Sequence, residues 1–127
     1  MQDVEVLVVE DQPDARELIR LVLQHQGAKI VEASSAREGL EIIKESTPDI
    51  LISDIGMPDE NGYSFIKKVR SLPKEKGGNI PALALTAYTK EEDKQKAIAA
   101  GFQMHMGKPL DITELVKAVV QLNPEKG

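Results

Sequence analysis

The sequence contains no cysteine and no tryptophan, and only two tyrosines and two phenylalanines among 127 residues. Without cysteine, the chain can form no disulfide, thiolate zinc site, iron–sulfur cluster or cysteine nucleophile. So few aromatic rings argue against a platform on which nucleic acid bases stack. Positive charge is also scarce, because 16 Lys and Arg residues against 21 Asp and Glu residues give a net charge of −5. We therefore expect no direct binding of nucleic acid.

Long apolar segments are missing as well. No stretch approaches the ~20 apolar residues that a membrane-spanning helix needs. The N-terminal residues 1–12 lack the basic segment and apolar core of a signal peptide. A chain of this length suits one domain with its own hydrophobic core. We expect a single soluble, cytoplasmic domain over residues 1–127 that does not contact a membrane.

The apolar pattern alternates between the periods of strands and helices. Short apolar runs predict strands over residues 4–9, 28–32, 49–54, 80–85 and 102–106. Between and after them, helical spacing predicts helices over 13–26, 36–47, 62–72, 90–100 and 112–122. Residues 74–79, with two glycines and two lysines, are predicted to form an exposed loop. Predicted inward positions in the first helix are Ala15, Leu18, Ile19, Val22 and Leu23, and in the last helix Ile112, Leu115, Val116, Val119 and Val120.

Strands that alternate with helices predict an α/β fold, a parallel sheet with helices on both faces. In such sheets, ligands bind outside the carboxyl ends of the strands. Functional residues are therefore expected at these strand ends.

Chemically complementary residues stand at four of the five predicted strand ends. Glu10 and Asp11 follow the first strand, Asp54 ends the third, Thr86 follows the fourth and Lys108 comes just after the fifth. Three neighbouring carboxylates repel one another unless a cation is present, and hard oxygen ligands suit Mg²⁺ or Mn²⁺. A lysine and a threonine hydroxyl can hold a phosphoryl group. A carboxylate can also act as a nucleophile and form an aspartyl phosphate.

Each residue also has a structural alternative. Asp11, ahead of Pro13, could cap the first helix, and Thr86 could cap the helix after the fourth strand. A Lys-Pro pair such as Lys108-Pro109 is usually part of a loop. The conjunction of four such ends on one edge of the sheet favours a functional site.

These motifs resemble those of the response-regulator receiver domains. The matching segments are Glu10-Asp11, residues 53–58 around Asp54, residues 61–63, residues 85–87 around Thr86, and residues 107–109 around Lys108. The resemblance covers essentially the whole chain. It implies a flavodoxin-like (βα)5 fold, a three-layer sandwich whose five parallel strands lie in the order 2-1-3-4-5.

The resemblance also implies a role for each acid. Asp54 would be the phosphoacceptor, and Glu10, Asp11, Asp54 and the backbone carbonyl of Gly56 would hold Mg²⁺ or Mn²⁺. Many family members have two aspartates at the first strand end. The extra methylene of Glu10 changes its distance to the metal or replaces direct coordination by a water-bridged contact.

Other residues would sense the phosphoryl group. Thr86 and Lys108 would each contact a phosphoryl oxygen, and small Ala87 would leave room for it. The family's usual switch aromatic on the fifth strand is missing, so His105 or Tyr88 is the candidate switch residue beside Thr86. The alternative for His105 is an exposed ring on the sheet edge. The resemblance further implies a cis peptide between Lys108 and Pro109.

The implied partner is a sensor histidine kinase or a histidine phosphotransfer domain, and the implied function is a two-component or phosphorelay switch. Such a domain catalyses its own phosphorylation and dephosphorylation but serves mainly as a signal. The chain leaves no room for an output domain, so we expect either a stand-alone regulator or a receiver of a larger hybrid kinase, as a monomer or weak dimer. The sequences of residues 54–58 and 101–105 resemble those of hybrid-kinase receivers and favour that origin.

Three other functions also use a fold or a site of this kind. A flavin-binding flavodoxin needs a Ser/Thr-rich phosphate loop and flanking aromatics, whereas Glu10 and Asp11 stand at that position. A haloacid-dehalogenase-type phosphatase needs a second acid where Gly56 stands. The remaining alternative is a phosphorylation-independent receiver that acts only as a binding module.

Overall fold

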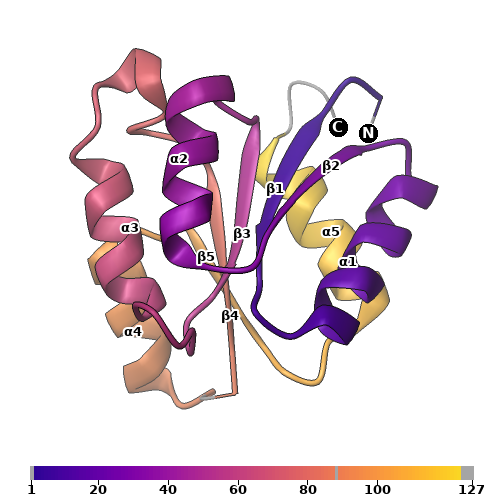
Figure 1. Cartoon of the computed structure of the whole chain (residues 1–127). Coiled ribbons are helices and arrows are strands. Elements are labelled where there is room, and N and C mark those ends of the chain that lie inside the picture. The colour runs from indigo at the N-terminus through magenta and orange to yellow at the C-terminus, as the bar shows by residue number, and fades with distance from the viewer. Residues whose placement is uncertain (1, 88, 124–127) are drawn as a thin grey trace.

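A computed structural model describes residues 2–87 and 89–123. Within them, five parallel strands form one sheet in the order β2-β1-β3-β4-β5 (Figure 1). Each predicted strand is present to within two residues of its predicted bounds. The strands are β1 (Glu5–Val9), β2 (Lys29–Ala33), β3 (Ile50–Asp54), β4 (Ala82–Thr86) and β5 (Met104–Gly107). The helices are α1 (Pro13–His25), α2 (Ala36–Ser46), α3 (Gly62–Arg70), α4 (Glu91–Ala100) and α5 (Ile112–Leu122).

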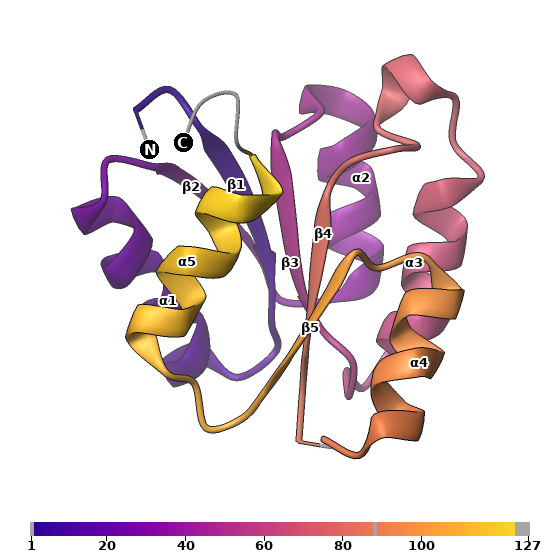
Figure 2. The same ribbon diagram turned by 180° about the vertical axis from the view of Figure 1, so that it is seen from behind.

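Helices cover both faces of the sheet. Figures 1 and 2 show α1 and α5 on one face and α2, α3 and α4 on the other. Successive side chains of a strand point to opposite faces, so each central strand supplies two hydrophobic cores. Leu7 and Leu51 join the core beneath α2–α4, whereas Val8 and Ile52 join the core beneath α1 and α5. Burial on both faces explains the nearly continuous apolar runs of β1, β3 and β4.

Polar residues fix where several helices begin. Ser35 caps α2 by accepting from the Glu38 amide, Asn61 caps α3 and Asp111 caps α5. A side-chain oxygen at this position satisfies one of the free amide groups of the first helical turn. The start of α1 is different, because Gln12 makes no side-chain cap bond and Pro13 fills the first position.

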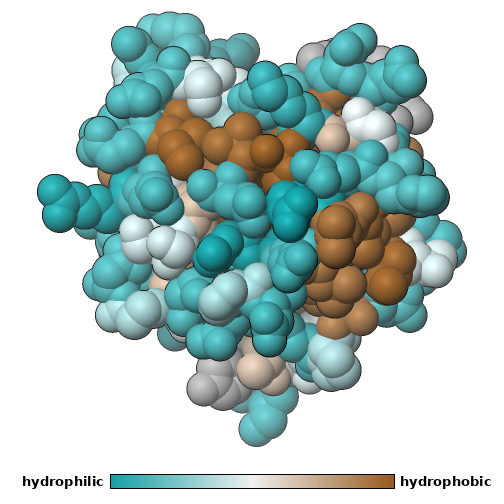
Figure 3. Space-filling model, turned by 45° about the vertical axis from the view of Figure 1, so that its right-hand side comes forward, coloured by the Kyte–Doolittle hydropathy of each residue, from teal (hydrophilic) through white to brown (hydrophobic). Residues whose placement is uncertain are grey.

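Three residues that the helical spacing predicts to point inward are exposed instead. Leu18 is 41% exposed, Ile112 51% and Val120 37%. The helical spacing identifies an apolar stripe, but the stripe is wider than the face that the sheet covers. Figure 3, which brings the side of α1 and α5 forward, shows apolar patches among hydrophilic residues.

The predicted exposed loop over residues 74–79 is partly structured. Lys74–Lys76 form a 3-10 turn, and Gly77 and Gly78 are buried. Gly77 has a φ of +98°, and a side chain there would collide with Ile43 of α2. The two glycines therefore allow the chain to pass close to α2.

None of the described helices has the length and apolarity that a membrane crossing requires.

Candidate functional site

The parallel sheet brings its strand ends to one edge, where the predicted site residues meet. Glu10 directly follows β1, Asp54 is the last residue of β3, Thr86 is the last residue of β4, and Lys108 directly follows β5. These segments are neighbours because β1 and β4 both flank β3, and β5 flanks β4. The topology thus assembles residues that lie up to 98 positions apart in the sequence.

Three carboxylates form the centre of the site. Glu10, Asp11 and Asp54 each offer an oxygen, and these oxygens lie within 4.8 Å of one another. Glu10 is completely buried and Asp54 is 6% exposed, while Asp11 is half-buried. This group of hard oxygen donors fits a divalent cation such as Mg²⁺.

Lys108 supplies the positive charge beside this cluster. Its Nζ lies 2.8 Å from Oε1 of Glu10 and 3.4 Å from Oδ1 of Asp54. The Lys108 side chain keeps 28% of its surface exposed, so the ammonium group remains at the rim of the site. The Lys108–Pro109 peptide bond is cis.

The pKa values of this pair are shifted by their surroundings. Burial raises the pKa of Glu10 and outweighs the opposing effect of its hydrogen bond with Lys108. Burial alone would lower the pKa of Lys108, but its hydrogen bond with Glu10 and the charge of Asp54 outweigh burial and raise it. Lys108 is therefore held firmly in its charged form.

A hollow of about 280 Å³ opens over the acids. Asp54 and Thr86 line it together with Asp11, Gln12, Gly56, Ala87 and Lys108. Thr86 is 1% exposed, and its carbonyl accepts from the Lys108 amide at 2.9 Å. The Gly56 amide donates to Oδ1 of Asp54 at 3.3 Å. Asp54, Thr86 and Lys108 thus line one cavity.

Neither candidate cap residue caps a helix. The first helix starts after Gln12, whose amide donates to Oε2 of Glu10 at 3.2 Å. The fourth helix starts at Glu91, too far along the chain for Thr86 to cap it. The structural alternatives for Asp11 and Thr86 are therefore wrong, and both residues line the hollow instead.

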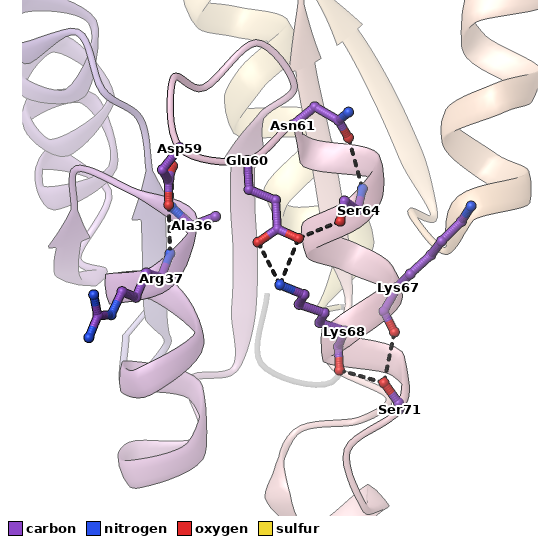
Figure 4. A network of polar contacts seen from close by, with 9 residues as sticks. All are labelled: Ala36, Arg37, Asp59, Glu60, Asn61, Ser64, Lys67, Lys68 and Ser71. Carbon is purple, nitrogen blue, oxygen red and sulfur yellow. Dashed lines mark hydrogen bonds and ion pairs between the residues drawn. The ribbon is translucent and has the colours of Figure 1, made fainter.

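The loop between β3 and α3, which carries Gly56, is fastened at two points (Figure 4). Asp59 accepts from the Ala36 and Arg37 amides at the start of α2, at 3.2 and 3.1 Å. Glu60 accepts from the Ser64 hydroxyl and pairs with Lys68 of α3 at 2.9 Å. Burial would raise the pKa of Asp59, but the amide donors outweigh it and hold the pKa below its ordinary value.

The two candidate switch residues have different outcomes. His105 is half-buried on β5, opposite Ala84 in the β4–β5 register. It faces the same side of the sheet as Thr86, two positions along the neighbouring strand. Tyr88 lies outside the described residues. A switching role for either one stays a prediction.

Sequence reasoning missed Gln12 and Asp59. Gln12 lines the hollow, and its amide holds Glu10. Asp59 caps a helix that begins 23 residues earlier. The sequence signal for a cap is a polar residue immediately before the helix. A cap supplied from a distant loop leaves no such signal.

Comparison with known proteins identifies relatives over nearly the whole chain. The model of the response regulator receiver domain matches residues 6–120. An uncharacterized 14.6 kDa protein of the sodA1 3′ region of Leptolyngbya boryana is 42% identical over 95% of this chain and 91% of its own length. The hybrid signal transduction histidine kinase D of Dictyostelium discoideum is 33% identical over 94% of this chain. The KDP operon regulator KdpE of Escherichia coli is 34% identical over 87%.

The chain spans 8% of the hybrid kinase and 47% of KdpE. Among solved structures, the chemotaxis response regulator CheY4 of Vibrio cholerae superposes with a TM-score of 0.87 at 31% identity. That match covers 94% of this chain and 98% of CheY4. The strand order and helix placement are those of the flavodoxin-like fold of this chemotaxis regulator. The chain therefore belongs to the family of response regulator receiver domains of two-component signalling.

Proposed function

We propose that Asp54 accepts a phosphoryl group from a phosphohistidine of a sensor histidine kinase or phosphotransfer domain. The observation that carries this proposal is the surroundings of Asp54. Its carboxylate lies at the floor of an open hollow, next to two further acids, a buried threonine and a lysine ammonium group. Receiver domains interact with histidine kinases or phosphotransfer proteins, and hybrid kinases are among the relatives of this chain.

The donor set fits Mg²⁺, which receiver domains generally bind, and Mn²⁺ has similar preferences. Asp11, Asp54 and the Gly56 carbonyl would hold the ion, with Glu10 completing the acidic cluster. Gly56 is exposed and lines the hollow, and a Cβ atom added to it would meet no atom within 4 Å beyond its chain neighbours. When bound, the ion would offset the negative charge that accumulates during phosphoryl transfer.

The residues of the chain would then divide the remaining work. A carboxylate oxygen of Asp54 attacks phosphorus, and the bond between phosphorus and the donor imidazole nitrogen breaks. The bonding electrons stay on that nitrogen, which takes up a proton, while Asp54 becomes an acyl phosphate. Lys108 would bind one phosphoryl oxygen and the Thr86 hydroxyl another, which stabilises the transferred charge.

Phosphorylation would change the interactions of the domain with its partners. The new group adds charge beside an already acidic site, and Lys108 and Thr86 must rearrange to contact it. Thr86 ends β4 and Lys108 directly follows β5, and the Lys108 amide donates a hydrogen bond to the Thr86 carbonyl. A rearrangement of either side chain can therefore affect both strands. The surface near His105 on β5 is therefore the expected place for a conformational response.

Incubation with acetyl phosphate or phosphoramidate and Mg²⁺, followed by intact mass measurement, tests the proposal. We expect one phosphoryl group on the wild-type protein and none on the Asp54→Asn variant. The Asp14→Asn variant, altered at an exposed aspartate of α1, is the matched control and should be phosphorylated normally. A missing adduct on the wild type, or one that persists in Asp54→Asn, would favour the alternative of a phosphorylation-independent binding module.

A further inference from the structure

The loop between β3 and α3 carries Gly56, whose carbonyl the proposed function assigns to the metal. Gly56 is exposed, and a side chain placed there would find open space. Glycine has the greatest backbone freedom of all residues, and Gly56 has no side chain that could fix the direction of its own carbonyl. The residues on either side of Gly56 must therefore set that direction.

The chain before Gly56 is fixed through its backbone. The Ile55 amide donates to the Leu85 carbonyl of β4 at 2.9 Å, and the Ile55 carbonyl accepts from the Gly62 amide of α3 at 2.7 Å. The side chain of Ile55 is buried in the core. The chain therefore enters Gly56 from a well-defined position.

The chain after Gly56 is held by two consecutive acids that bind different helices (Figure 4). Asp59 turns to α2 and accepts from the first two amides of that helix, with Oδ1 at 3.2 Å and Oδ2 at 3.1 Å. Glu60 turns to α3, where it accepts from the Ser64 hydroxyl and pairs with Lys68. The partners of Glu60 lie only four and eight residues further along the chain. Asp59 instead ties the loop to a helix that starts 23 residues earlier.

The link between Asp59 and Gly56 is short and stiff. It consists of Met57, which is 7% exposed and packs into the core beneath α2–α4, and of Pro58. The ring of Pro58 fixes its own φ and restricts Met57 to extended conformations. Few free torsions therefore separate the carboxylate on α2 from the carbonyl of Gly56.

A simple helix cap would use the same hydrogen bonds, but α2 has a local cap of its own. The Ser35 hydroxyl accepts from the Glu38 amide at 3.2 Å, and the Glu38 carboxylate accepts from the Ser34 amide at 2.7 Å. Such a reciprocal pair satisfies the start of a helix from its own sequence. Asp59 is therefore not needed to define where α2 begins.

We propose that Asp59 is a positioning residue for the metal site, which holds Gly56 in the orientation in which its carbonyl can bind the ion. A carboxylate that accepts two amides at a helix N-terminus is a strong attachment, because the charge and the helix dipole favour each other. Asp59 itself is not among the described residues that line the hollow. This inference rests on the proposed binding of Mg²⁺ by Asp54 and Gly56.

The first test needs neither metal nor phosphoryl donor. The backbone order parameter of the Gly56 amide is measured by NMR relaxation in excess chelator. We expect it to fall from about 0.85 in the wild type to about 0.6 or below in Asp59→Ala. Ser35→Ala is the matched control and should resemble the wild type, because it removes an acceptor from the same helix start without touching the loop. An unchanged value in Asp59→Ala, or an equal fall in Ser35→Ala, would overturn the proposal.

The second test measures Mg²⁺ affinity by calorimetry. Removing a residue that orients a metal ligand costs about 10- to 100-fold in affinity, and because Asp59 acts through the backbone we expect about tenfold in Asp59→Ala. Asp59→Asn removes the same charge but keeps one acceptor oxygen, so it should lose only about threefold, and Ser35→Ala less than about twofold. Equal losses in Asp59→Ala and Asp59→Asn would assign the effect to charge alone and contradict the positioning role.

These measurements also separate this inference from the proposed function. If Asp54 accepted no phosphoryl group, the order parameters and Mg²⁺ affinities would still decide the role of Asp59. A wild-type protein that bound no Mg²⁺ would overturn the proposed metal site and this inference together. A failure confined to the Asp59 variants would overturn the inference alone.

Discussion

Gly62, the first residue of α3, packs directly beneath the proposed phosphoacceptor. A Cβ atom built on Gly62 would lie 2.7 Å from the Asp54 carbonyl oxygen and 2.8 Å from Cα of Ile55. Ordinary contacts begin at 3.4 Å, so the backbone would have to move by several tenths of an ångström. The Gly62 amide also donates to the Ile55 carbonyl at 2.7 Å, which ties the two segments together. A Gly62→Ala substitution must therefore push α3 and the Asp54 backbone apart.

The magnitude follows from two opposing effects. Alanine is favoured over glycine in a helix by up to about 1 kcal/mol. Overpacking against atoms that cannot move aside costs about 1–3 kcal/mol. We expect Gly62→Ala to lower the free energy of unfolding by about 1–2 kcal/mol, which lowers the Tm by roughly 4–8 °C. Because the displaced backbone belongs to Asp54, Mg²⁺ affinity should fall as well.

Urea unfolding and Mg²⁺ calorimetry measure both effects. The matched control for stability is Gly56→Ala in the loop that precedes α3, where an added Cβ meets nothing within 4 Å. That variant should keep its stability or gain up to about 1 kcal/mol. If Gly62→Ala were as stable as the wild type and bound Mg²⁺ equally well, the close packing of α3 against Asp54 would not constrain the site.

Two further predictions concern the cap on α2 and the lysine. Asp59→Ala should lower the free energy of unfolding by about 1 kcal/mol at pH 7, and Asp59→Asn by less, in urea denaturation against the exposed control Glu41→Gln. Because the folded-state pKa of Asp59 is below its ordinary value of 3.8, this stabilisation is complete above that value and is lost as pH falls through the folded pKa. A deficit in Asp59→Ala that stayed constant into acid would contradict the cap. Lys108→Ala should keep Mg²⁺ binding, but phosphorylation of this variant should no longer shift the amide resonances of β5 in NMR spectra. If phosphorylation shifted these resonances as much in Lys108→Ala as in the wild type, this role of Lys108 would be refuted.

The sequence alone determined the fold class and the edge of the sheet that carries the site. Apolar runs predict β1, β3 and β4 most directly, because strands buried on both faces must be almost continuously apolar. Asp54, Thr86 and Lys108 could be placed together because parallel strands end on one side of a sheet. These inferences need only local pattern and the general geometry of α/β folds.

Only the tertiary structure decided which side chains contact one another and how far each apolar stripe is covered. Lys108 lies 2.8 Å from Glu10 and 3.4 Å from Asp54, and no sequence spacing encodes a difference of tenths of an ångström. Asp59 caps α2 because a loop folds back over it. Ile112 is exposed because neighbouring elements cover only part of the apolar face of α5. Sequence periodicity shows which face of an element is apolar. Only distances across the fold decide which neighbours that face packs against and which partner each charged side chain contacts.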